Sequence, residues 1–387
     1  PLILACMLYT TLLIANTKND ISTSQIPFYS ERITVRYHNS MLFTTTVSVQ
    51  EKQMISYYKH LQQADYQLLL DELQQIKQQF ALNDWFYYRL LEKVVDHVYA
   101  GRSKLQRTLS CWFLLSKSGY DTRLTYLEDQ VFVYVYTTDA LFEVPMIQSE
   151  GKTFVNLSTI RQKDRSRQML YVLNFIPVST NDPFSFDLSV LPQLRPQLVD
   201  KELQFSYKNQ QHKLKVQLDL TIPQLMSDYP FFEETRYLRA PLSRTLEQSL
   251  LPQLRRLLHG KSQREAVELL VSFTRSFPYK EDKEYFGKSK PMIADEVFHY
   301  RYSDCEDRSA LFYQLTRRLL DLPMVIVAFP DHLTIGVELL ENVGTAVLYK
   351  KRKYYICDPT GPADSSAIGF IPKNYERSSF KILGTYR

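Results

Sequence analysis

Hydrophobic residues recur at helical spacing in four long stretches of the chain, which are residues 56–82, 84–100, 241–260 and 262–277. Apolar side chains three and four positions apart lie on one side of a helix, so each stretch is predicted to form an amphipathic helix. Asp84 is the expected N-cap of the second helix, and Ser262 with Glu265 makes a capping-box pattern before the fourth. We expect these helices to pack against sheets.

Alternating apolar and polar residues predict strands between these helices. Residues 32–37 and 41–49 flank the polar turn "HNS" and predict a hairpin. Further on, apolar residues at 214, 216, 218 and 220 alternate with polar ones, which is typical of a half-buried antiparallel sheet. The pattern therefore predicts an α+β protein with three folded regions: an N-terminal α+β domain at 26–160, a β-rich middle domain at 161–239 and a C-terminal domain at 240–387.

The region after residue 302 combines one helix with several strands. Ser303 and Glu306 form a capping-box pattern, and helical periodicity follows as far as residue 320. Strand patterns come next, in "MVIVAF", "LTIGVEL", "AVLYK" and "YYICDPT". This order places Cys305 in the first turn of a helix, His332 at the start of a strand and Asp358 at the end of another.

These three residue types, on these elements, are typical of a nucleophilic thiol site. The positive end of a helix favours the thiolate, which is the reactive form of Cys305. An imidazole can take the thiol proton, and a carboxylate can hold the imidazole in the required tautomer. Carboxylates on both sides of Cys305 in "DCED" oppose the thiolate, because nearby negative charge raises the pKa of a thiol.

The C-terminal region resembles a known family. "DCED" at a helix start, "H" at a strand start and "CDPT" at a strand end are similar to the transglutaminase-like superfamily, which has a papain-like fold, and "HYRYSDCEDRSALF" is especially similar to its bacterial members. The resemblance covers residues 239–386. It implies Cys305 as nucleophile, His332 as base and Asp358 as orienting acid.

The resemblance also implies a metal. Related bacterial periplasmic cysteine proteinases hold calcium with acidic residues that flank the cysteine, and Asp304 and Glu306 occupy the matching places here. Two carboxylates alone make a poor calcium site, because Ca²⁺ takes six to eight oxygen ligands. No other cofactor is expected.

An oxyanion donor is expected from the aromatic segment that precedes Cys305, with Tyr302 and Tyr300 as candidates beside the Cys305 amide.

Taken singly, each residue of the predicted triad has a simpler interpretation, as a buried thiol, a surface histidine or a turn. Their joint order favours a catalytic site. A zinc site made of Cys305, His332 and Cys357 is disfavoured, since no CxxC or HxxxH spacing supports it.

Residues 103–159 repeat the succession of helix and strands, which suggests that this part of the N-terminal domain is a degenerate copy of the same fold. Aligning the helices by their ends pairs Cys305 with Ser103 or Lys104, His332 with Asp129 or Gln130, and Asp358 with Leu157 or Ser158. The copy would then lack the catalytic residues.

The composition of the chain argues against several classes of function. The chain has 387 residues, 44% of them hydrophobic, and a net charge of +5 from 47 basic and 42 acidic residues without a dense basic stripe, so nucleic acid is not an expected partner. Its 10 glycines form no phosphate-binding motif, and its four cysteines make no disulfide framework. Cys305 is therefore expected to be a free thiol. If the protein is exported, a free thiol is more easily explained by catalysis than by structure.

The first fifteen residues are apolar and of signal-peptide length, so residues 1–25 are interpreted as a signal peptide or membrane anchor with a linker. This predicts an exported protein, periplasmic or anchored on the outer side of the inner membrane.

The expected activity is hydrolysis of a peptide or isopeptide bond in a protein or peptide substrate of the cell envelope. The alternatives are a non-catalytic binding or assembly module with the same fold, and a protein cross-linking transglutaminase.

Overall fold

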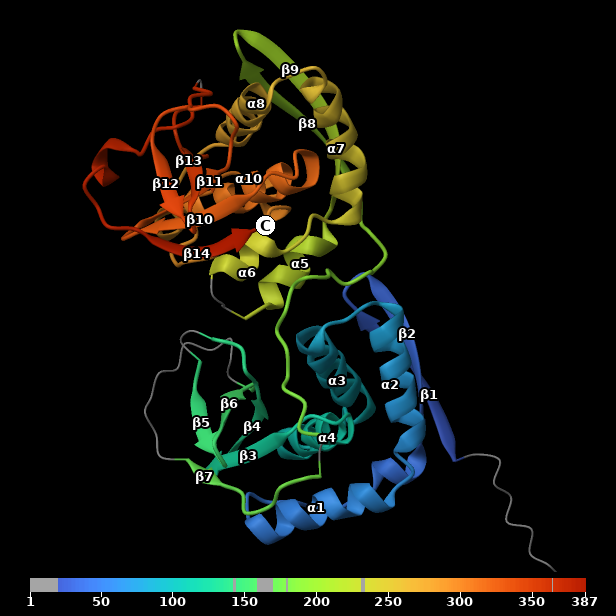
Figure 1. Ribbon diagram of the computed structural model, residues 1–387. Coiled ribbons are helices and arrows are strands. Elements are labelled where there is room, and N and C mark those ends of the chain that lie inside the picture. Colours follow the sequence, from blue (N-terminus) through green and yellow to red (C-terminus); the bar gives the residue numbers. More distant parts are fainter. Residues whose placement is uncertain (1–19, 142–143, 159–169, 179, 231–233, 364) are drawn as a thin grey trace, which may run out of the picture.

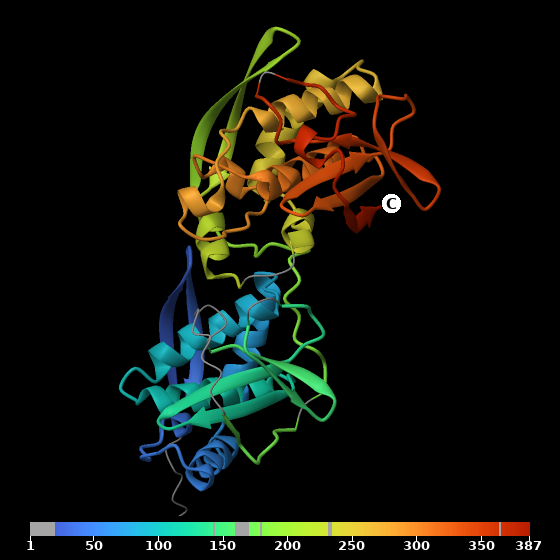
Figure 2. The same ribbon diagram turned by 90° about the vertical axis from the view of Figure 1, so that its left-hand side faces the viewer.

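The computed structural model describes residues 20–141, 144–158, 170–178, 180–230, 234–363 and 365–387 (Figure 1). The proposed signal peptide or anchor at residues 1–15 lies outside the described residues. Every helix within the described ranges is too short or too polar to cross a membrane. The chain is a mixed α and β protein, and its two halves form two lobes, the second above the first (Figures 1 and 2).

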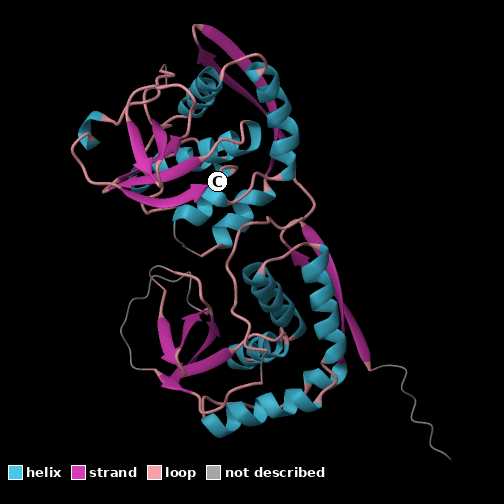
Figure 3. Cartoon of the chain, in the orientation of Figure 1, coloured by secondary structure: helices cyan, strands magenta, loops and turns pink. Residues whose placement is uncertain are grey.

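The first half contains a hairpin, four helices and a five-stranded antiparallel sheet (Figure 3). Its elements are β1 (Ile21–Phe28), β2 (Glu31–His38), the 3-10 helix η1 (Asn39–Leu42), α1 (Glu51–Gln63), α2 (Gln67–Gln79), α3 (Asp84–Val98), α4 (Lys104–Lys117), β3 (Thr122–Leu127), β4 (Gln130–Tyr136), β5 (Met146–Ser149), β6 (Lys152–Asn156) and β7 (Tyr171–Val172). The strand order is β5-β6-β4-β3-β7. Trp85 of α3 and Trp112 of α4 are fully buried in its core.

Three local predictions for this half are wrong. Strand β2 pairs with β1 and not with residues 41–49, because Ile26 and Phe28 at the end of β1 are buried and give β2 an earlier partner. The expected linker therefore ends at residue 20. The long stretch 56–82 lies in two helices, α1 and α2, and α3 is capped by Asn83 instead of Asp84.

The second half has a similar set of elements. They are β8 (Leu198–Tyr207), β9 (Gln210–Asp219), α5 (Thr221–Asp228), α6 (Glu234–Arg239), α7 (Arg244–Leu258), α8 (Gln263–Arg275), α9 (Asp282–Tyr285), the 3-10 helix η2 (Glu296–Phe298), α10 (Cys305–Leu319), β10 (Met324–Phe329), β11 (His332–Val337), β12 (Ala346–Tyr349), β13 (Arg352–Cys357), the 3-10 helix η3 (Lys373–Tyr375) and β14 (Lys381–Tyr386). The sheet order is β12-β13-β11-β10-β14, and every pairing is antiparallel. The capping box of Ser262 and Glu265 at α8 is confirmed.

Residues 161–239, expected as a separate β-rich domain, are divided between the two halves in their described part. Strand β7 lies at the edge of the first sheet. The hairpin β8–β9 buries its alternating apolar residues in the core of the second half, against α7 and α8. Helix α5 buries Ile222 and Leu225 in the core of the first half. A two-stranded hairpin buries too little apolar surface to be stable alone, so it depends on the helices beside it.

The two sheets have the same strand order when β3 to β7 are matched with β10 to β14. A helix with a capping box, α4 or α10, precedes each sheet. The turns between the first two strands are equivalent, with Leu127 opposite Gln130 in one and Phe329 opposite His332 in the other. His332 therefore corresponds to Gln130.

The same matching extends to the other two candidate residues. Cys305 and Lys104 each begin their helix. Tyr134 pairs with Asn156 where Gly336 pairs with Ile356, so Asp358 corresponds to Ser158. The two halves differ most in front of this helix. Residues 276–304 separate α8 from α10, whereas only residues 99–103 separate α3 from α4.

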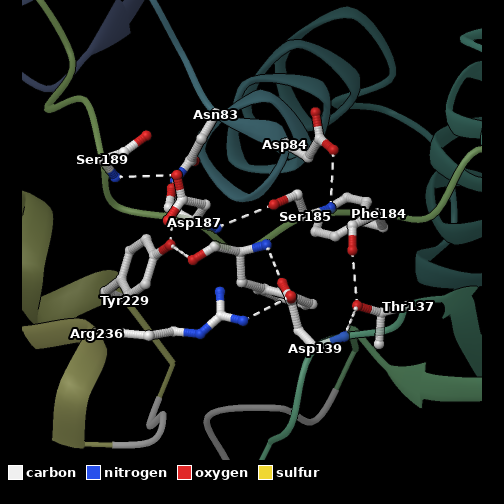
Figure 4. Close-up of polar contacts among 11 residues, drawn as sticks. Asn83, Asp84, Thr137, Asp139, Phe184, Ser185, Asp187, Ser189, Tyr229 and Arg236 are labelled. Carbon is white, nitrogen blue, oxygen red and sulfur yellow. Dashed lines mark hydrogen bonds and ion pairs between the residues drawn. The ribbon is translucent and has the colours of Figure 1, made fainter. Parts of the chain in front are cut away.

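Polar contacts fix the two halves to each other through the segment 184–189 (Figure 4). Asp139 accepts hydrogen bonds from the Phe186 N–H at 2.7 Å and from the Arg236 guanidinium at 2.6 Å. Tyr229 donates its hydroxyl proton to the Phe186 carbonyl, and Asp84 accepts the Ser185 N–H at 2.9 Å. Since Tyr229 and Arg236 follow β9, these bonds tie the start of the second half to the first.

The buried carboxyl group of Asp295, which directly precedes η2, predicts a pH dependence of stability. Asp295 is 2% exposed and accepts the Ser243 N–H at 2.9 Å. Burial raises the pKa of Asp295 to about 7. A carboxyl group whose folded pKa lies above its unfolded value adds stability at low pH and loses that contribution as the pH rises toward the folded pKa.

We therefore expect the stability of wild type relative to Asp295→Asn to fall by about 1.4 kcal/mol per pH unit between about pH 4 and 7. Urea unfolding of both proteins across this range measures the difference. A difference that is independent of pH would show that Asp295 is ionised in the folded protein.

Candidate active site

Cys305 is the first residue of α10, and Asp304 caps this helix. The Asp304 carboxylate accepts the N–H groups of Glu306 and Asp307, and Asp307 completes a capping box by accepting the Asp304 N–H. The predicted box of Ser303 with Glu306 is therefore one residue too early, because Ser303 instead makes a short bridge with Tyr279. The Cys305 N–H belongs to the first helical turn, where amides have no acceptor within the helix.

The predicted base and acid are joined directly. His332 Nε2 lies 3.2 Å from Asp358 Oδ1. The same carboxylate oxygen accepts the Thr360 N–H at 3.1 Å and the Thr360 hydroxyl at 2.8 Å. Burial raises the pKa of Asp358, but the bonds from His332 and Thr360 outweigh burial and hold that pKa below its usual value. Asp358 is therefore an anion beside the imidazole.

Packing of α10 on β11 brings the thiol to this pair. Ser309 on α10 donates to the Leu333 carbonyl at 3.1 Å, and the Cys305 thiol interacts with the Leu333 backbone. Leu333 follows His332 on β11. Cys305 is 8% exposed, and the side chains of His332 and Asp358 are each also 8% exposed. The three residues predicted from the sequence therefore lie near one another, where the first turn of α10 packs on the start of β11.

The electrostatic surroundings oppose ionisation of the thiol. Burial raises the pKa of Cys305 most, and the carboxylates of Asp304, Glu306 and Glu281 raise it further. The Leu333 backbone acts in the opposite direction. These surroundings therefore favour the neutral thiol of Cys305 over the thiolate.

Two buried arginines that the sequence analysis missed support the site. Arg275, at the end of α8, donates two hydrogen bonds to the Asp358 carbonyl, at 2.6 and 3.0 Å, and one to the Ser365 carbonyl at 2.8 Å. Arg308 on α10 donates to the Phe277 carbonyl. In the sequence both look like ordinary helix-surface arginines, since only the packed structure shows that they are buried.

Two tyrosines near the triad were also missed. Tyr375 of η3 stacks on His332, with ring centroids 5.1 Å apart and planes 8° apart. Tyr279 precedes α9 and interacts electrostatically with Cys305. The predicted oxyanion candidates have other described contacts: Tyr302 packs on Tyr285, and Tyr300 packs on Phe286 below the Lys290 ammonium.

A group of buried carboxylates lies beside Cys305 and suits a cation. Carboxylate oxygens of Asp282, Asp304 and Asp307 all lie within 4.8 Å of one another. Burial raises the pKa of each, that of Asp304 to about 6, and repulsion from the other carboxylates of the group adds to this effect at Asp304 and Asp307. Asp304 was predicted as a calcium ligand, whereas Glu306, the other predicted ligand, is outside the group. Three hard oxygen donors of like charge fit Ca²⁺ in chemistry, with further ligands still needed.

Comparisons with protein-family models, with curated proteins and with solved structures find no match. The function is therefore inferred from the geometry of this site.

Proposed function

We propose that the protein is a cysteine-dependent acyl-transfer enzyme of the transglutaminase-like type, which hydrolyses peptide or isopeptide bonds in protein substrates. The observation that carries this proposal is the 3.2 Å contact between His332 and Asp358 beside the buried Cys305 thiol at the start of α10. An exported location, in the periplasm or on the outer side of the inner membrane, follows from the apolar segment 1–15 and is part of the proposal.

The chemistry proceeds in two steps. Since Asp358 is an anion, His332 keeps its proton on Nε2, and its Nδ1 takes the proton of Cys305. The sulfur attacks the carbonyl carbon, His332 protonates the leaving amine, and a thioester remains. Water then gives a proton to His332 and attacks the thioester, which releases the acid and restores the thiol. The Cys305 N–H is placed to stabilise the oxyanion in both steps.

The comparison of the two halves supports a functional role for this site. The extra segment 276–304 of the second half carries Tyr279, Glu281 and Asp282, which all act on Cys305 or its neighbour Asp304. The matching positions of the first half hold Lys104, Gln130 and Ser158. We regard the first half as a degenerate copy without the catalytic residues.

Calcium would be held by Asp282, Asp304 and Asp307. Its charge would neutralise Asp304, whose carboxylate raises the pKa of the Cys305 thiol.

A second candidate function is a non-catalytic binding module, and the raised pKa of Cys305 favours it. Cross-linking, the other alternative, also requires a cleft that excludes water and admits an amine.

The pH dependence of Cys305 alkylation by iodoacetamide separates these functions. For the enzyme we expect labelling at pH 7 to be at least roughly tenfold faster in wild type than in His332→Ala, because imidazole stabilises the thiolate. Calcium is expected to increase the wild-type rate. Peptide mass analysis distinguishes Cys305 from the buried thiols Cys111 and Cys357. Slow labelling in both proteins, with and without calcium, would favour the binding module.

A further inference from the structure

We infer that the substrate carries a positively charged side chain, such as lysine or arginine, close to the bond that is cleaved. This inference rests on the proposed function and adds the chemical class of the substrate. It follows from two tyrosine–carboxylate pairs, Tyr279 with Glu281 and Tyr375 with Asp331, which lie beside Cys305 and His332 and which we call the entrance.

The first pair is Tyr279 with Glu281, in the segment before α9. The Tyr279 hydroxyl donates a hydrogen bond to the Glu281 carboxylate. Tyr279 is 41% exposed and forms a short bridge with Ser303, two residues before Cys305, and the Glu281 carboxylate raises the pKa of the Cys305 thiol. This pair places an aromatic ring and a negative charge on one side of the thiol.

The second pair is Tyr375 with Asp331, beside the base. Asp331 precedes His332 and is exposed, and its carboxylate interacts with the Tyr375 hydroxyl and raises the pKa of Tyr375. The Tyr375 ring stacks on His332. The first pair therefore lies beside the chain that leads into Cys305, and the second pair lies beside His332.

Two basic groups lie near this entrance, and one of them already lies on the Tyr279 ring, so the attraction for a further cation comes mainly from the exposed carboxylates of Glu281 and Asp331. The Arg308 guanidinium lies over the Tyr279 ring at 5.0 Å, but it is 2% exposed and donates to the Phe277 carbonyl. Lys280 lies over Tyr302 at 5.7 Å. The charges that act most strongly on Cys305 are the carboxylates of Asp304, Glu306 and Glu281.

Aromatic rings combined with carboxylates attract organic cations. A ring face contributes through its quadrupole, and a carboxylate contributes through its charge. A cationic side chain next to the scissile carbonyl would meet both at this entrance, whereas an acidic side chain would be repelled.

Charged thiol reagents test the entrance without a known substrate. Methanethiosulfonates carrying a trimethylammonium or a sulfonate group both transfer a thioalkyl group to Cys305 and release methanesulfinate. We expect the ratio of the cationic to the anionic rate at Cys305 to exceed the ratio for mercaptoethanol roughly tenfold at low salt. The excess should largely disappear at about 1 M NaCl, where the screening length is about 3 Å.

Variants assign the effect to the two pairs. Glu281→Gln and Asp331→Asn should each lower the ratio, and the double variant should lower it further, while Asp304 and Glu306 keep it above that of mercaptoethanol. Glu284→Gln, which removes another exposed carboxylate of α9, is the matched control and should leave the ratio unchanged. A wild-type ratio equal to that of mercaptoethanol, a ratio unaffected in the double variant, or no reaction with either reagent would overturn the inference.

Peptides that differ at a single position test whether the charge preference of the entrance also affects hydrolysis. Quenched-fluorescent peptides that differ only in lysine, norleucine or glutamate next to the cleaved bond should be hydrolysed in that order of kcat/KM. Equal hydrolysis of all three would overturn the inference and leave the proposed function standing. A charge-dependent reagent ratio without hydrolysis of any peptide would instead overturn the proposed function.

Discussion

Replacing Cys305 by alanine is expected to lower the hydrolysis of a quenched-fluorescent peptide mixture by roughly 10⁴-fold or more, because covalent catalysis is lost with the nucleophile. Asp358→Asn should cost roughly 10³–10⁴-fold, although it preserves the shape of the site, because an amide can favour the wrong tautomer of His332. The 3.2 Å contact between His332 and Asp358 makes this second variant the more informative one.

The matched control is Cys111→Ala, which removes another buried thiol in the first half. It should keep full activity. Equal loss in Cys111→Ala and Cys305→Ala would mean that folding, and not chemistry, explains the effect. Undiminished activity in Cys305→Ala would contradict the proposed mechanism.

Replacing Arg275 by methionine is expected to destabilise the second half by about 3–5 kcal/mol, because the carbonyls of Asp358 and Ser365 lose their buried donors. Gly361 packs against the same guanidinium, where a Cβ atom would lie 2.8 Å from Arg275 Cζ. The whole turn after β13 is therefore built around this side chain.

Urea unfolding measures this loss. Arg264→Met is the control on the same helix, since its guanidinium is half exposed and makes one ion pair, with the largely buried Glu268. We expect a smaller change there, of about 1 kcal/mol or less, because Tyr207 still contacts the Glu268 carboxylate. Similar small effects in both variants would show that Arg275 does not anchor the turn.

The candidate triad could be predicted because each member lies at the end of a strongly patterned element. Helical periodicity after Cys305 and alternation after His332 fixed their places on α10 and β11. Strand pairing then determined which of these ends meet. Tyr375 was not predictable in this way, since it comes from the irregular segment between β13 and β14 and reaches His332 only through the folded chain.

Local patterns failed where tertiary packing decided the outcome. Residues 41–49 have strand-like composition, yet β1 supplies the partner of β2. Residues 161–239 looked like one domain because their strands are close in sequence, but their apolar faces are buried in two different cores. The sequence pattern predicted that one side of each strand is apolar, but it did not indicate which helices would cover that side.

The burial of α5 in the first core determines how the chain can be divided. A cut between β7 and β8 would separate Ile222, Leu225 and Tyr229 from the residues that cover them. It would also remove the Asp228 carbonyl, which accepts the Trp85 indole N–H at 3.1 Å. A fragment made only of the second half would expose an apolar helix and tend to aggregate, so the half with the thiol needs the half without it as a folding partner.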